Sequence, residues 1–275
     1  MKLFVTGGTG FIGSHFITQA LSAGHDIVAL RRPGAALKIK LEKEPAWVDG
    51  NLDGDWHRIL KECNALVHFA AAGVIPHKAN WLECYQANVM DSLQLWIRAA
   101  DAGVRRFVLA GSCFEYGKSG ELHDEIPASA PLLPTGPYHA SKASASLAAI
   151  GFCSQKNVEV QLLRPFHVFG EGESEERFWP SLRKAAIAGQ DFPMTSGEQV
   201  RDFVPVEEVA RQFLKACSEP LVPGNPHIRN IGSGNPQTLR QFAEYWWKHW
   251  EASGKLKFGE LPYRVGEVMR YVPKI

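Results

Sequence analysis

The hydrophobic positions in the first half of the chain fall into short apolar runs separated by longer segments with helical spacing. The runs are Leu3–Thr6, Asp26–Leu30, Ala65–Ala70 and Arg106–Ala110, and the helix-like segments between them include Ile12–Ala23 and Asn88–Ala102. Runs that are apolar at successive positions suit strands buried on both faces, and their alternation with helices indicates βαβ units. The pattern predicts an α/β fold built on a doubly wound parallel sheet.

The second half continues this pattern less regularly. Strands are expected at Val158–Leu163 and His227–Ile231, and the proline- and glycine-containing region between them predicts mostly irregular structure. After Thr238 the spacing predicts a helix that ends near Gly254, with apolar residues at Leu239, Phe242, Ala243, Trp246, Trp247 and Trp250. The tryptophans of this helix are expected to pack in a core or an interface.

Composition excludes several classes of protein. Of the 275 residues, 45% are hydrophobic and 21% are charged, and 30 Lys plus Arg stand against 29 Asp plus Glu. These are values of a soluble globular protein, and the net charge of +1 provides no general field to attract polyanions or anionic lipid. We therefore expect no nucleic-acid partner and no membrane partner.

The cysteines and the N-terminus favour a cytoplasmic protein without a metal site. The five cysteines form no C-x-x-C pair, which argues against a disulfide framework and a structural zinc site: Cys63, Cys84, Cys113, Cys153 and Cys217. No apolar run reaches the ~20 residues that a membrane-spanning helix requires. The first residues also lack the long apolar region of a signal peptide.

A glycine-rich motif directly follows the first expected strand and opens the first expected helix. In it, Gly7 permits a tight turn, Gly10 lets the backbone approach a pyrophosphate, and Gly13 lets the helix pack against the strand. Phosphates would then lie at the helix N-terminus, where backbone N–H groups are free. The motif predicts a dinucleotide cradle made by Gly7, Thr9, Gly10, Phe11, Ile12 and Gly13.

The second expected strand ends in two arginines, Arg31 and Arg32. At this distance from the glycines, an acidic residue normally accepts a hydrogen bond from the ribose 2′-hydroxyl of NAD. Arginines can instead make charge-assisted contacts with a 2′-phosphate. The sequence therefore favours NADP(H) over NAD(H), the alternative being that both arginines are simply solvated.

A candidate reactive set follows in the middle of the chain. Tyr138 and Lys142 lie four residues apart on an expected helix and so share one face. A lysine ammonium close to a phenol lowers the tyrosine pKa, which suits a proton shuttle. Ser112 follows the Arg106–Ala110 strand, at the edge of a parallel sheet where ligands bind, and can hydrogen-bond a substrate oxygen. With a nicotinamide, Ser112, Tyr138 and Lys142 would form a hydride-transfer site.

The chain resembles a known family from residue 1 to about residue 272. The motifs that carry the resemblance are Thr-Gly-Gly-Thr-Gly-Phe-Ile-Gly at 6–13, His-Phe-Ala-Ala at 68–71, Asn-Val at 88–89, Gly-Ser at 111–112 with Tyr-Gly at 116–117, Tyr-x-x-x-Lys at 138–142, Leu-Arg-Pro at 163–165 with Val-Phe-Gly at 168–170, Arg-Asp-Phe-Val at 201–204 and Asn-Ile-Gly-Ser-Gly at 230–234. In this order they are similar to those of the extended short-chain dehydrogenase/reductases, in particular the nucleotide-sugar epimerase/dehydratase/reductase group.

The resemblance implies a domain organisation and further site residues. Residues 1–165 would form a Rossmann domain and 166–275 mainly a substrate-binding domain, with segments near 201–215 and 227–232 returning to the first. Asn88 would complete the catalytic set of Ser112, Tyr138 and Lys142 by holding the lysine through water. Further cofactor contacts are implied at Asn51, Leu52, Phe69, Ala70, Ala71, Tyr138, Lys142 and Pro165. The helices near 88–102 and 138–155 would pair into a homodimer, or else be buried within one chain.

The resemblance also implies a substrate site for a nucleotide-sugar. Arg201 and Arg264 match two positions that grip the substrate diphosphate. His167 stands where relatives usually have an asparagine, so it either contacts the substrate differently or is simply packed. His77 could border the sugar, although a solvated loop histidine fits its position better.

The residues after Ser112 bear on the reaction. Related 4,6-dehydratases place an Asp-Glu pair there, whereas this chain has Cys113 and Phe114, so dehydratase activity is not expected, and Glu115 is expected to be structural or at the rim. With Arg31 and Arg32, the first expectation is an NADPH-dependent reductase of a nucleotide-linked 4-keto-6-deoxyhexose, with Tyr138 as proton donor. The alternatives are an NAD-dependent nucleotide-sugar 4-epimerase and a non-catalytic NADP-sensing module.

Overall fold

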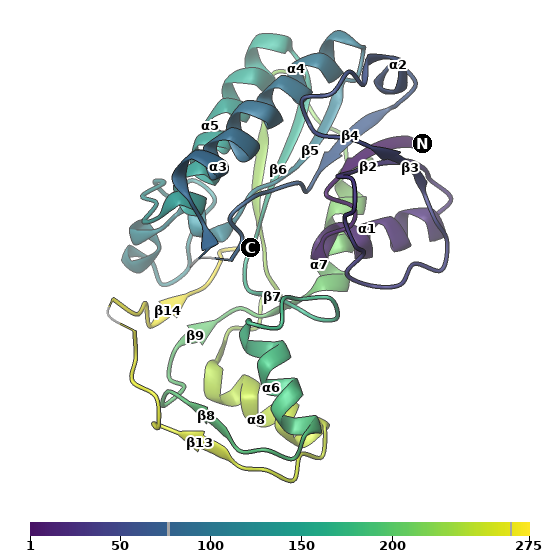
Figure 1. Cartoon of the computed structure of the whole chain (residues 1–275). Helices are drawn as coiled ribbons and strands as arrows, with labels where there is room; N and C mark the ends of the chain where they lie inside the picture. The colour runs from purple at the N-terminus through teal and green to yellow at the C-terminus, as the bar shows by residue number, and fades with distance from the viewer. Residues whose placement is uncertain (76–77, 265) are drawn as a thin grey trace.

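The computed structural model describes residues 1–75, 78–264 and 266–275. Within them the main element is a parallel sheet of seven strands in the order β11-β6-β5-β4-β1-β2-β3 (Figure 1). The strands are β1 (Lys2–Thr6), β2 (Asp26–Arg31), β3 (Ala46–Asp49), β4 (Ala65–His68), β5 (Arg106–Ala110), β6 (Glu159–Pro165) and β11 (His227–Ile231). The chain order reverses between β1 and β4, as in a doubly wound Rossmann-like sheet. The predicted fold class is thus confirmed.

Helices cover both faces of this sheet (Figure 1). One face carries α1 (Phe11–Ser22) and α7 (Val206–Ala216), which pack on each other and share an apolar core with Val5 and Val67. The other carries α2 (His57–Leu60), α3 (Trp81–Tyr85), the π-helix η2 (Gln86–Asp91), α4 (Ser92–Asp101) and α5 (Pro137–Lys156). Two buried cores therefore hold the sheet from opposite sides.

The helix expected at Asn88–Ala102 begins earlier than the apolar spacing indicated. Asn80 caps it, because its side-chain oxygen accepts a hydrogen bond of 3.0 Å from the backbone N–H of Glu83. From Trp81 the chain stays helical through η2 to Asp101. The π-helical turn breaks the 3.6-residue spacing, so the apolar pattern before Asn88 does not indicate that this segment belongs to the same helix.

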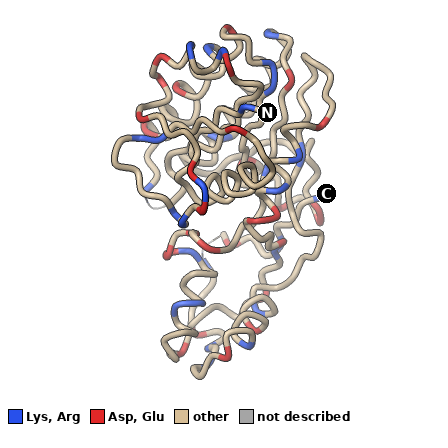
Figure 2. The backbone as a smooth tube through the Cα atoms, turned by 90° about the vertical axis from the view of Figure 1, so that its right-hand side faces the viewer, with Lys and Arg blue, Asp and Glu red and all other residues tan. Residues whose placement is uncertain are grey.

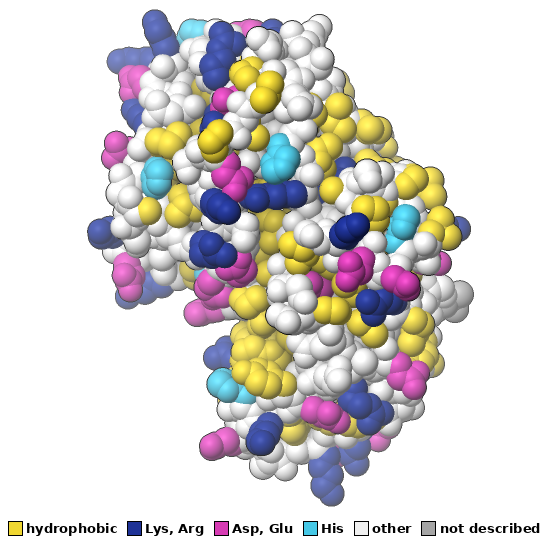
Figure 3. Space-filling view, turned by 180° about the vertical axis from the view of Figure 1, so that it is seen from behind, with side chains coloured by type: hydrophobic (Ala, Val, Ile, Leu, Met, Phe, Trp, Pro, Cys, Tyr) yellow, Lys and Arg dark blue, Asp and Glu magenta, His cyan; other side chains and the backbone are white. Residues whose placement is uncertain are grey.

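A smaller lobe lies below the sheet and is mostly formed by the second half of the chain (Figure 1). Its helices are α6 (Phe178–Ile187) and α8 (Leu239–His249), and its strands are β7 (Val168–Phe169), β8 (Phe192–Met194), β9 (Val200–Arg201), β10 (Val204–Pro205), β12 (Gln237–Thr238), β13 (Leu256–Phe258) and β14 (Arg270–Tyr271). Leu182, Ala243 and Trp247 form its core. Seen from behind, part of this lobe carries a contiguous hydrophobic area (Figure 3).

The expectation of mostly irregular structure between β6 and β11 was wrong. Two helices, α6 and α7, lie there, and α7 buries Val206, Val209, Ala210 and Phe213 at helical spacing. The sequence contains this helical spacing, in a segment that is flanked by prolines and glycines. The last helix, α8, ends at His249, five residues before Gly254, because Glu251 takes a left-handed backbone conformation with φ of 51°.

The chain's end returns to the larger lobe. The backbone N–H of Lys274 donates to the Ile126 carbonyl at 2.9 Å, and the Tyr271 hydroxyl donates to the Cys113 carbonyl at 2.8 Å. Cys113 opens the short 3-10 helix η3 (Cys113–Glu115), and a second one, η4, spans Lys118–Leu122. The C-terminal segment therefore packs directly against the loop that follows β5.

The surface agrees with the balanced charge of the sequence. Lys and Arg alternate with Asp and Glu along the backbone over both lobes (Figure 2). Among the described residues, no helix is long and apolar enough to span a membrane, and no group of three or more His, Cys, Asp and Glu could hold a metal ion. All five cysteines are free and buried.

Candidate active site

The glycine loop fits a dinucleotide pyrophosphate. Gly7 has φ of +69°, and a Cβ on it would lie 2.5 Å from the Ala70 backbone nitrogen. A Cβ on Gly13 would lie 2.2 Å from the Gly7 carbonyl oxygen, so these two positions admit glycine alone. Gly10 is the N-cap of α1 and offers no side chain to the first helical N–H groups, which are left for a ligand.

The other expected cofactor residues surround this loop. Thr9 accepts a backbone hydrogen bond from Lys38 at 3.2 Å, and Phe11 and Ile12 form the first turn of α1. The partly exposed ring of Phe69 packs on Phe16 and Phe213 at 5.2 and 4.7 Å. Ala70 and Ala71 follow β4, Pro165 is the buried last residue of β6, and Asn51 and Leu52 follow β3. Asn51 is exposed, and Leu52 packs partly into the core.

The two arginines at the end of β2 differ in their surroundings. Arg31 donates from Nε to Asp49 Oδ1 at 2.7 Å, and its guanidinium lies 5.2 Å from the centre of the Trp47 ring. The pair raises the pKa of Arg31 and lowers that of Asp49, in each case mainly through their mutual hydrogen bond. Arg32 is exposed. Asp49 gives no signal in the sequence, because only the pairing of β2 with β3 brings it beside Arg31.

Ser112 is fixed at the carboxyl end of β5. It is the N-cap of η3, where its hydroxyl accepts from the Phe114 N–H at 3.3 Å and its own N–H donates to Glu115 Oε1 at 2.7 Å. Burial raises the pKa of Tyr138 to about 12, and a hydrogen bond with the Ser112 side chain pulls it back in the opposite direction. The structure thus brings the Ser112 hydroxyl and the Tyr138 phenol together.

Lys142 lies one helical turn after Tyr138 on α5, and its ammonium donates to the Ala110 carbonyl. Burial lowers the pKa of Lys142, and the negative charge of Glu115 opposes this. The expectation that Lys142 lowers the pKa of Tyr138 is not met in this structure. Desolvation of the phenol outweighs the favourable charges near it, and the lysine is engaged by Ala110.

Asn88 sits in the π-helix and is almost fully buried. Its side chain accepts from the Ala72 N–H at 2.7 Å and donates to the Ala72 carbonyl at 3.0 Å and to the Ser141 hydroxyl at 2.9 Å. Asn88 and Lys142 line the same small cavity, of about 10 Å³, together with His68. This is the volume that about one water molecule needs, so the geometry suits the water-mediated link that the resemblance implied.

Glu115 is a structural residue rather than a rim contact. Its carboxylate is fully buried, and it accepts from Arg164 Nε at 2.8 Å and from the Ser146 hydroxyl at 2.6 Å. Glu115 also accepts from the Ser112 N–H, so the buried Glu115–Arg164 pair holds the loop of Ser112 against β6 and α5. A carboxylate held in this way is not free to act as an acid or a base.

His167 is neutral in the folded protein. Burial lowers its pKa to about 3, with the charges of Arg201 and Arg177 adding to the effect, and its Nε2 has no hydrogen-bond partner among the described residues. Phe114 lies edge-on to it at 6.4 Å and stacks on His139 at 4.9 Å. His167 therefore belongs to an aromatic wall beside Tyr138, with one polar nitrogen left for a ligand.

The diphosphate arginines are placed differently from one another. Arg201 is mostly buried, and it donates to Glu267 at 3.0 Å and to the Val268 carbonyl at 2.7 Å. Arg264 is exposed on the segment between β13 and β14. His77 lies outside the described residues.

Two charged residues near the site were not singled out from the sequence. Arg177 is the N-cap of α6, and its positive charge lowers the pKa of both Tyr138 and Cys113 against the larger effect of burial. Glu173 is buried, with Oε2 unpartnered among the described residues, and burial raises its pKa to about 7. Charged residues in a loop give no sequence signal, because only the fold shows which of them point inward.

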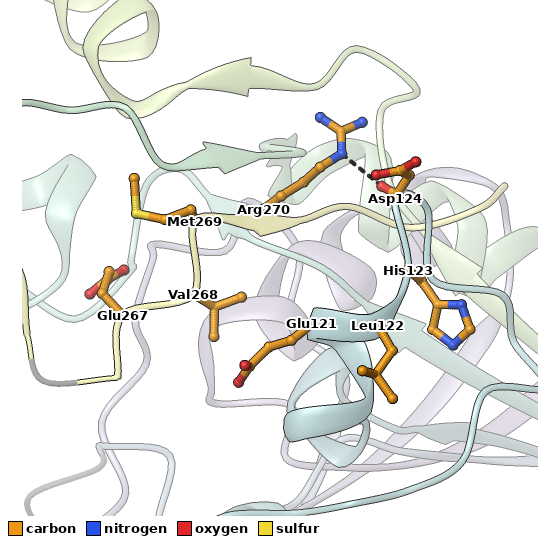
Figure 4. Close-up of a pocket in the computed structure, with 8 residues that line it drawn as sticks. All are labelled: Glu121, Leu122, His123, Asp124, Glu267, Val268, Met269 and Arg270. Atoms are coloured by element: carbon orange, nitrogen blue, oxygen red, sulfur yellow. Dashed lines mark hydrogen bonds between the residues drawn. The ribbon is translucent and has the colours of Figure 1, made fainter.

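A cavity of about 420 Å³ opens between η4 and β14 (Figure 4). Glu121, Asp124 and Glu267 supply carboxylates to its lining, and Arg270 Nε donates to the Asp124 carbonyl at 2.8 Å. None of Ser112, Tyr138 or Lys142 lines it. It touches the site through Glu267 and Val268, which both accept hydrogen bonds from Arg201.

Comparison with known proteins decides the family. Residues 3–232 match the sequence pattern described as the NAD dependent epimerase/dehydratase family. The chain belongs to this family. The predicted resemblance and the prediction of an NAD(P)-dependent enzyme are confirmed.

Members of the epimerase/dehydratase family match this chain over nearly its whole length. UDP-glucose 4-epimerase of Lactobacillus helveticus is 25% identical over 288 residues, covering 97% of this chain and 84% of the relative. dTDP-6-deoxy-L-talose 4-dehydrogenase (NAD(+)) of Aggregatibacter actinomycetemcomitans is 25% identical over 276 residues, covering 96% of both. The solved structure of MoeE5 in complex with UDP-glucose and NAD is 26% identical with a TM-score of 0.84, covering 100% of this chain and 90% of MoeE5.

Proposed function

We propose that this chain is an NAD(P)-dependent epimerase that inverts C4 of a nucleotide-linked sugar. The observation that carries the proposal is that Ser112, Tyr138 and Lys142 lie at the carboxyl edge of the sheet that also carries an intact glycine cradle. Relatives named UDP-glucose 4-epimerase support both the substrate class and the reaction. The first expectation from the sequence was a 4-ketoreductase, and the 4-epimerase proposed here was given there as an alternative.

The chain's own residues would handle the oxygen and the proton of C4. When bound, a nicotinamide cofactor would supply the reversible hydride transfer at C4 that inversion of this carbon requires. Tyr138 takes the hydroxyl proton during oxidation and gives it back during reduction. Ser112 hydrogen-bonds the same oxygen, and its hydrogen bond to Tyr138 lowers the pKa of the phenol, which makes the phenolate easier to form. Lys142 adds a buried positive charge on the same helix face.

Substrate binding is assigned to cations around His167. Arg201 would exchange its bond to Glu267 for a phosphate oxygen, and Arg264, on its exposed segment, would reach the same diphosphate. Arg177 supplies a further positive charge close to Tyr138. His167 offers Nε2 to a sugar hydroxyl.

The surroundings of Ser112 oppose a dehydratase. Cys113 and Phe114 replace the acid and base that loss of water requires, and burial raises the pKa of the Cys113 thiol to about 12. Glu115, the carboxylate that follows Cys113 and Phe114 in the chain, is locked to Arg164.

A net 4-ketoreductase is the second candidate. One observation favours it: dTDP-6-deoxy-L-talose 4-dehydrogenase (NAD(+)) is among the relatives, 25% identical over 276 residues. The NADP(H) preference predicted from Arg31 and Arg32 gains no support from MoeE5, whose structure holds NAD.

We also propose a homodimer built on α3 and α5, in the cytoplasm. Leu82 on α3 and Leu147 on α5 leave 84% and 61% of their surface exposed, and Trp81 and Met90 nearby are more than half exposed. α3 and α5 pack on each other, so their apolar residues can form one patch. A second copy would cover it.

The test is a substrate panel followed by two readouts. UDP-glucose, UDP-galactose and their N-acetylated and uronic acid counterparts would be incubated with the protein and NAD+, and products separated by chromatography. The proposal predicts interconversion of C4 epimers with no net change of absorbance at 340 nm. Stoichiometric oxidation of NADH or NADPH with a nucleotide-linked 4-keto-6-deoxyhexose would instead establish the reductase.

A further inference from the structure

We infer that Asp49, at the end of β3, selects NAD(H) over NADP(H) by holding Arg31 and presenting a carboxylate where the adenosine ribose is bound. The inference rests on the proposed function only in requiring a dinucleotide at the glycine cradle. It assigns to a neighbouring strand the role that an acidic residue at the end of β2 normally has.

The sheet register places Asp49 beside Arg31. β2 and β3 are parallel, and Arg31 is the direct partner of Asp49 at their carboxyl ends. Because they are register partners on neighbouring strands, both side chains leave the sheet on the same face and at the same level. The two strands lie about 4.8 Å apart. The Nε to Oδ1 distance of 2.7 Å shows that the guanidinium and the carboxylate meet.

Trp47 fixes the pair next to the glycine loop. It precedes Asp49 by two residues, on the same face of β3, and its ring lies under the Arg31 guanidinium at 5.2 Å. A Cβ on Gly8 would come within 3.6 Å of the Trp47 ring, so the indole touches the loop that cradles the pyrophosphate. The indole N–H is itself bonded to Glu44. Arg31, Asp49 and the cradle therefore belong to one contiguous surface.

This arrangement treats a hydroxyl and a phosphate differently. Arg31 uses Oδ1 of Asp49, and Oδ2 accepts no hydrogen bond from the residues that the structure describes, so it can accept one from a ribose hydroxyl. A 2′-phosphate carries close to two negative charges at neutral pH and would meet the carboxylates of Asp49 and Glu44. To bind it, Arg31 would have to leave Asp49, and Asp49 would then face the phosphate unpaired. Arg32 is a further cation at the end of β2, and it is exposed to water and salt.

The test is calorimetric binding of NAD+ and NADP+ without substrate, so that it does not depend on turnover. The wild-type protein is expected to bind NAD+ at least about tenfold more tightly than NADP+, the effect of one charge-assisted hydrogen bond. Asp49→Asn keeps the shape of the side chain and removes its charge, and it is expected to shift the ratio of the two affinities at least about tenfold towards NADP+.

Two further variants separate this inference from its competitors. Asp26→Asn, at the opposite end of β2, is the matched control and should leave the ratio unchanged. Arg31→Ala should keep the preference for NAD+, because Asp49 then repels a 2′-phosphate without compensation. A wild-type preference for NADP+ that Arg31→Ala abolishes would overturn the inference, and so would an Asp49→Asn ratio equal to that of the wild type. Failure to bind either dinucleotide would contradict the proposed function as well.

Discussion

Tyr138 carries a protonated phenol at neutral pH in this structure, because burial raises its pKa to about 12. A phenol in that form can donate a proton to a developing alkoxide. The hydrogen bond with Ser112 lowers the pKa of Tyr138 and so favours the phenolate, which can take the proton from a hydroxyl. The two residues come from different elements, η3 and α5, yet both are fixed by the buried Glu115, which bonds the Ser112 N–H and the Ser146 hydroxyl of α5. The reactive oxygens are therefore positioned by an ion pair that takes no part in the chemistry.

Replacing Tyr138 tests its role directly. Tyr138→Phe is expected to lower turnover at least about 100-fold, the usual contribution of a general acid–base group, while NAD+ affinity stays within a few-fold of the wild type. Steady-state kinetics and calorimetry measure the two quantities. Tyr245→Phe, at a 62% exposed position on α8, is the control and should leave both unchanged. Full turnover in Tyr138→Phe would show that another group moves the proton.

Glu173 makes stability depend on pH in a direction that can be worked out. Burial raises its pKa from 4.5 to about 7, so the folded protein holds a proton there that the unfolded chain has already lost. The stability associated with this proton is fully present below about pH 4.5 and is lost as the pH rises to about 7, by on the order of 3 kcal/mol. Glu173→Gln should therefore raise the melting temperature at pH 8 and have little effect at pH 4.5. Glu175→Gln, in which an exposed carboxylate is removed, should show no such difference between the two pH values. Equal shifts for Glu173→Gln at both pH values would refute the assignment.

Some of these residues could be predicted from the sequence and others could not. Gly7, Gly13, Ser112, Tyr138 and Lys142 stand in local motifs, where spacing alone shows which side chains share a turn or a helix face. Asp49 acts on Arg31 of the neighbouring strand, and Arg177, at the start of α6, acts through its charge on Tyr138 of α5. No window of sequence shows that Asp49 is the register partner of Arg31, and this pairing is what changes the interpretation of the two arginines.

At the scale of elements, the turn between β1 and α1 sets the geometry of the cofactor site. Gly7 and Gly24 both have positive φ, at +69° and +80°, but a Cβ on Gly7 would collide with the Ala70 backbone, whereas one on Gly24 would meet nothing within 4 Å. The strain of a left-handed alanine, about 1–2 kcal/mol, is thus common to both positions. The collision is specific to Gly7.

This difference provides a matched pair of variants. Gly24→Ala is expected to cost about 1 kcal/mol of stability and to leave NAD+ affinity unchanged. Gly7→Ala should cost more and should weaken NAD+ binding at least about tenfold, because the loop after β4 must move away from β1. Chemical denaturation and calorimetry measure the two effects. NAD+ affinity retained in Gly7→Ala would argue against the cradle.

Six strands of the sheet were predictable because each is a short run rich in apolar residues, whereas β3 was not, because none of its residues is buried and no helix separates it from β2. The smaller lobe was not, because its strands are two or three residues long and pair across large sequence separations, as β13 does with β8. The early start of the helix at Trp81 was hidden by the π-helical turn around Asn88. That turn is also what places Asn88 beside Lys142 on one cavity, so the irregularity coincides with the site.

At the scale of the whole molecule, the two lobes meet where the loops of the sheet face β7, β9 and the returning C-terminal segment (Figure 1). Leu82 on α3 and Leu147 on α5, the exposed apolar residues of the proposed dimer contact, lie on the larger lobe.

Leu147→Glu tests the dimer. Leu147 is 61% exposed on α5, and a carboxylate there should convert a wild-type dimer into a monomer in sedimentation-velocity experiments without unfolding it. Ile187→Glu, at a 67% exposed position on α6, is the control and should leave the wild-type mass unchanged. A monomeric wild-type protein would contradict the proposed assembly.

The most direct measurement of the central claim follows the hydrogen at C4. UDP-galactose deuterated at C4 would be incubated with the protein and NAD+ in ordinary water, and the UDP-glucose formed would be analysed by NMR and mass spectrometry. The account predicts that the product keeps its deuterium at C4, because the hydride leaves for the nicotinamide and comes back within one binding event. Loss of the deuterium to solvent would contradict it, as would the absence of C4 inversion in this and every other nucleotide-sugar of the panel.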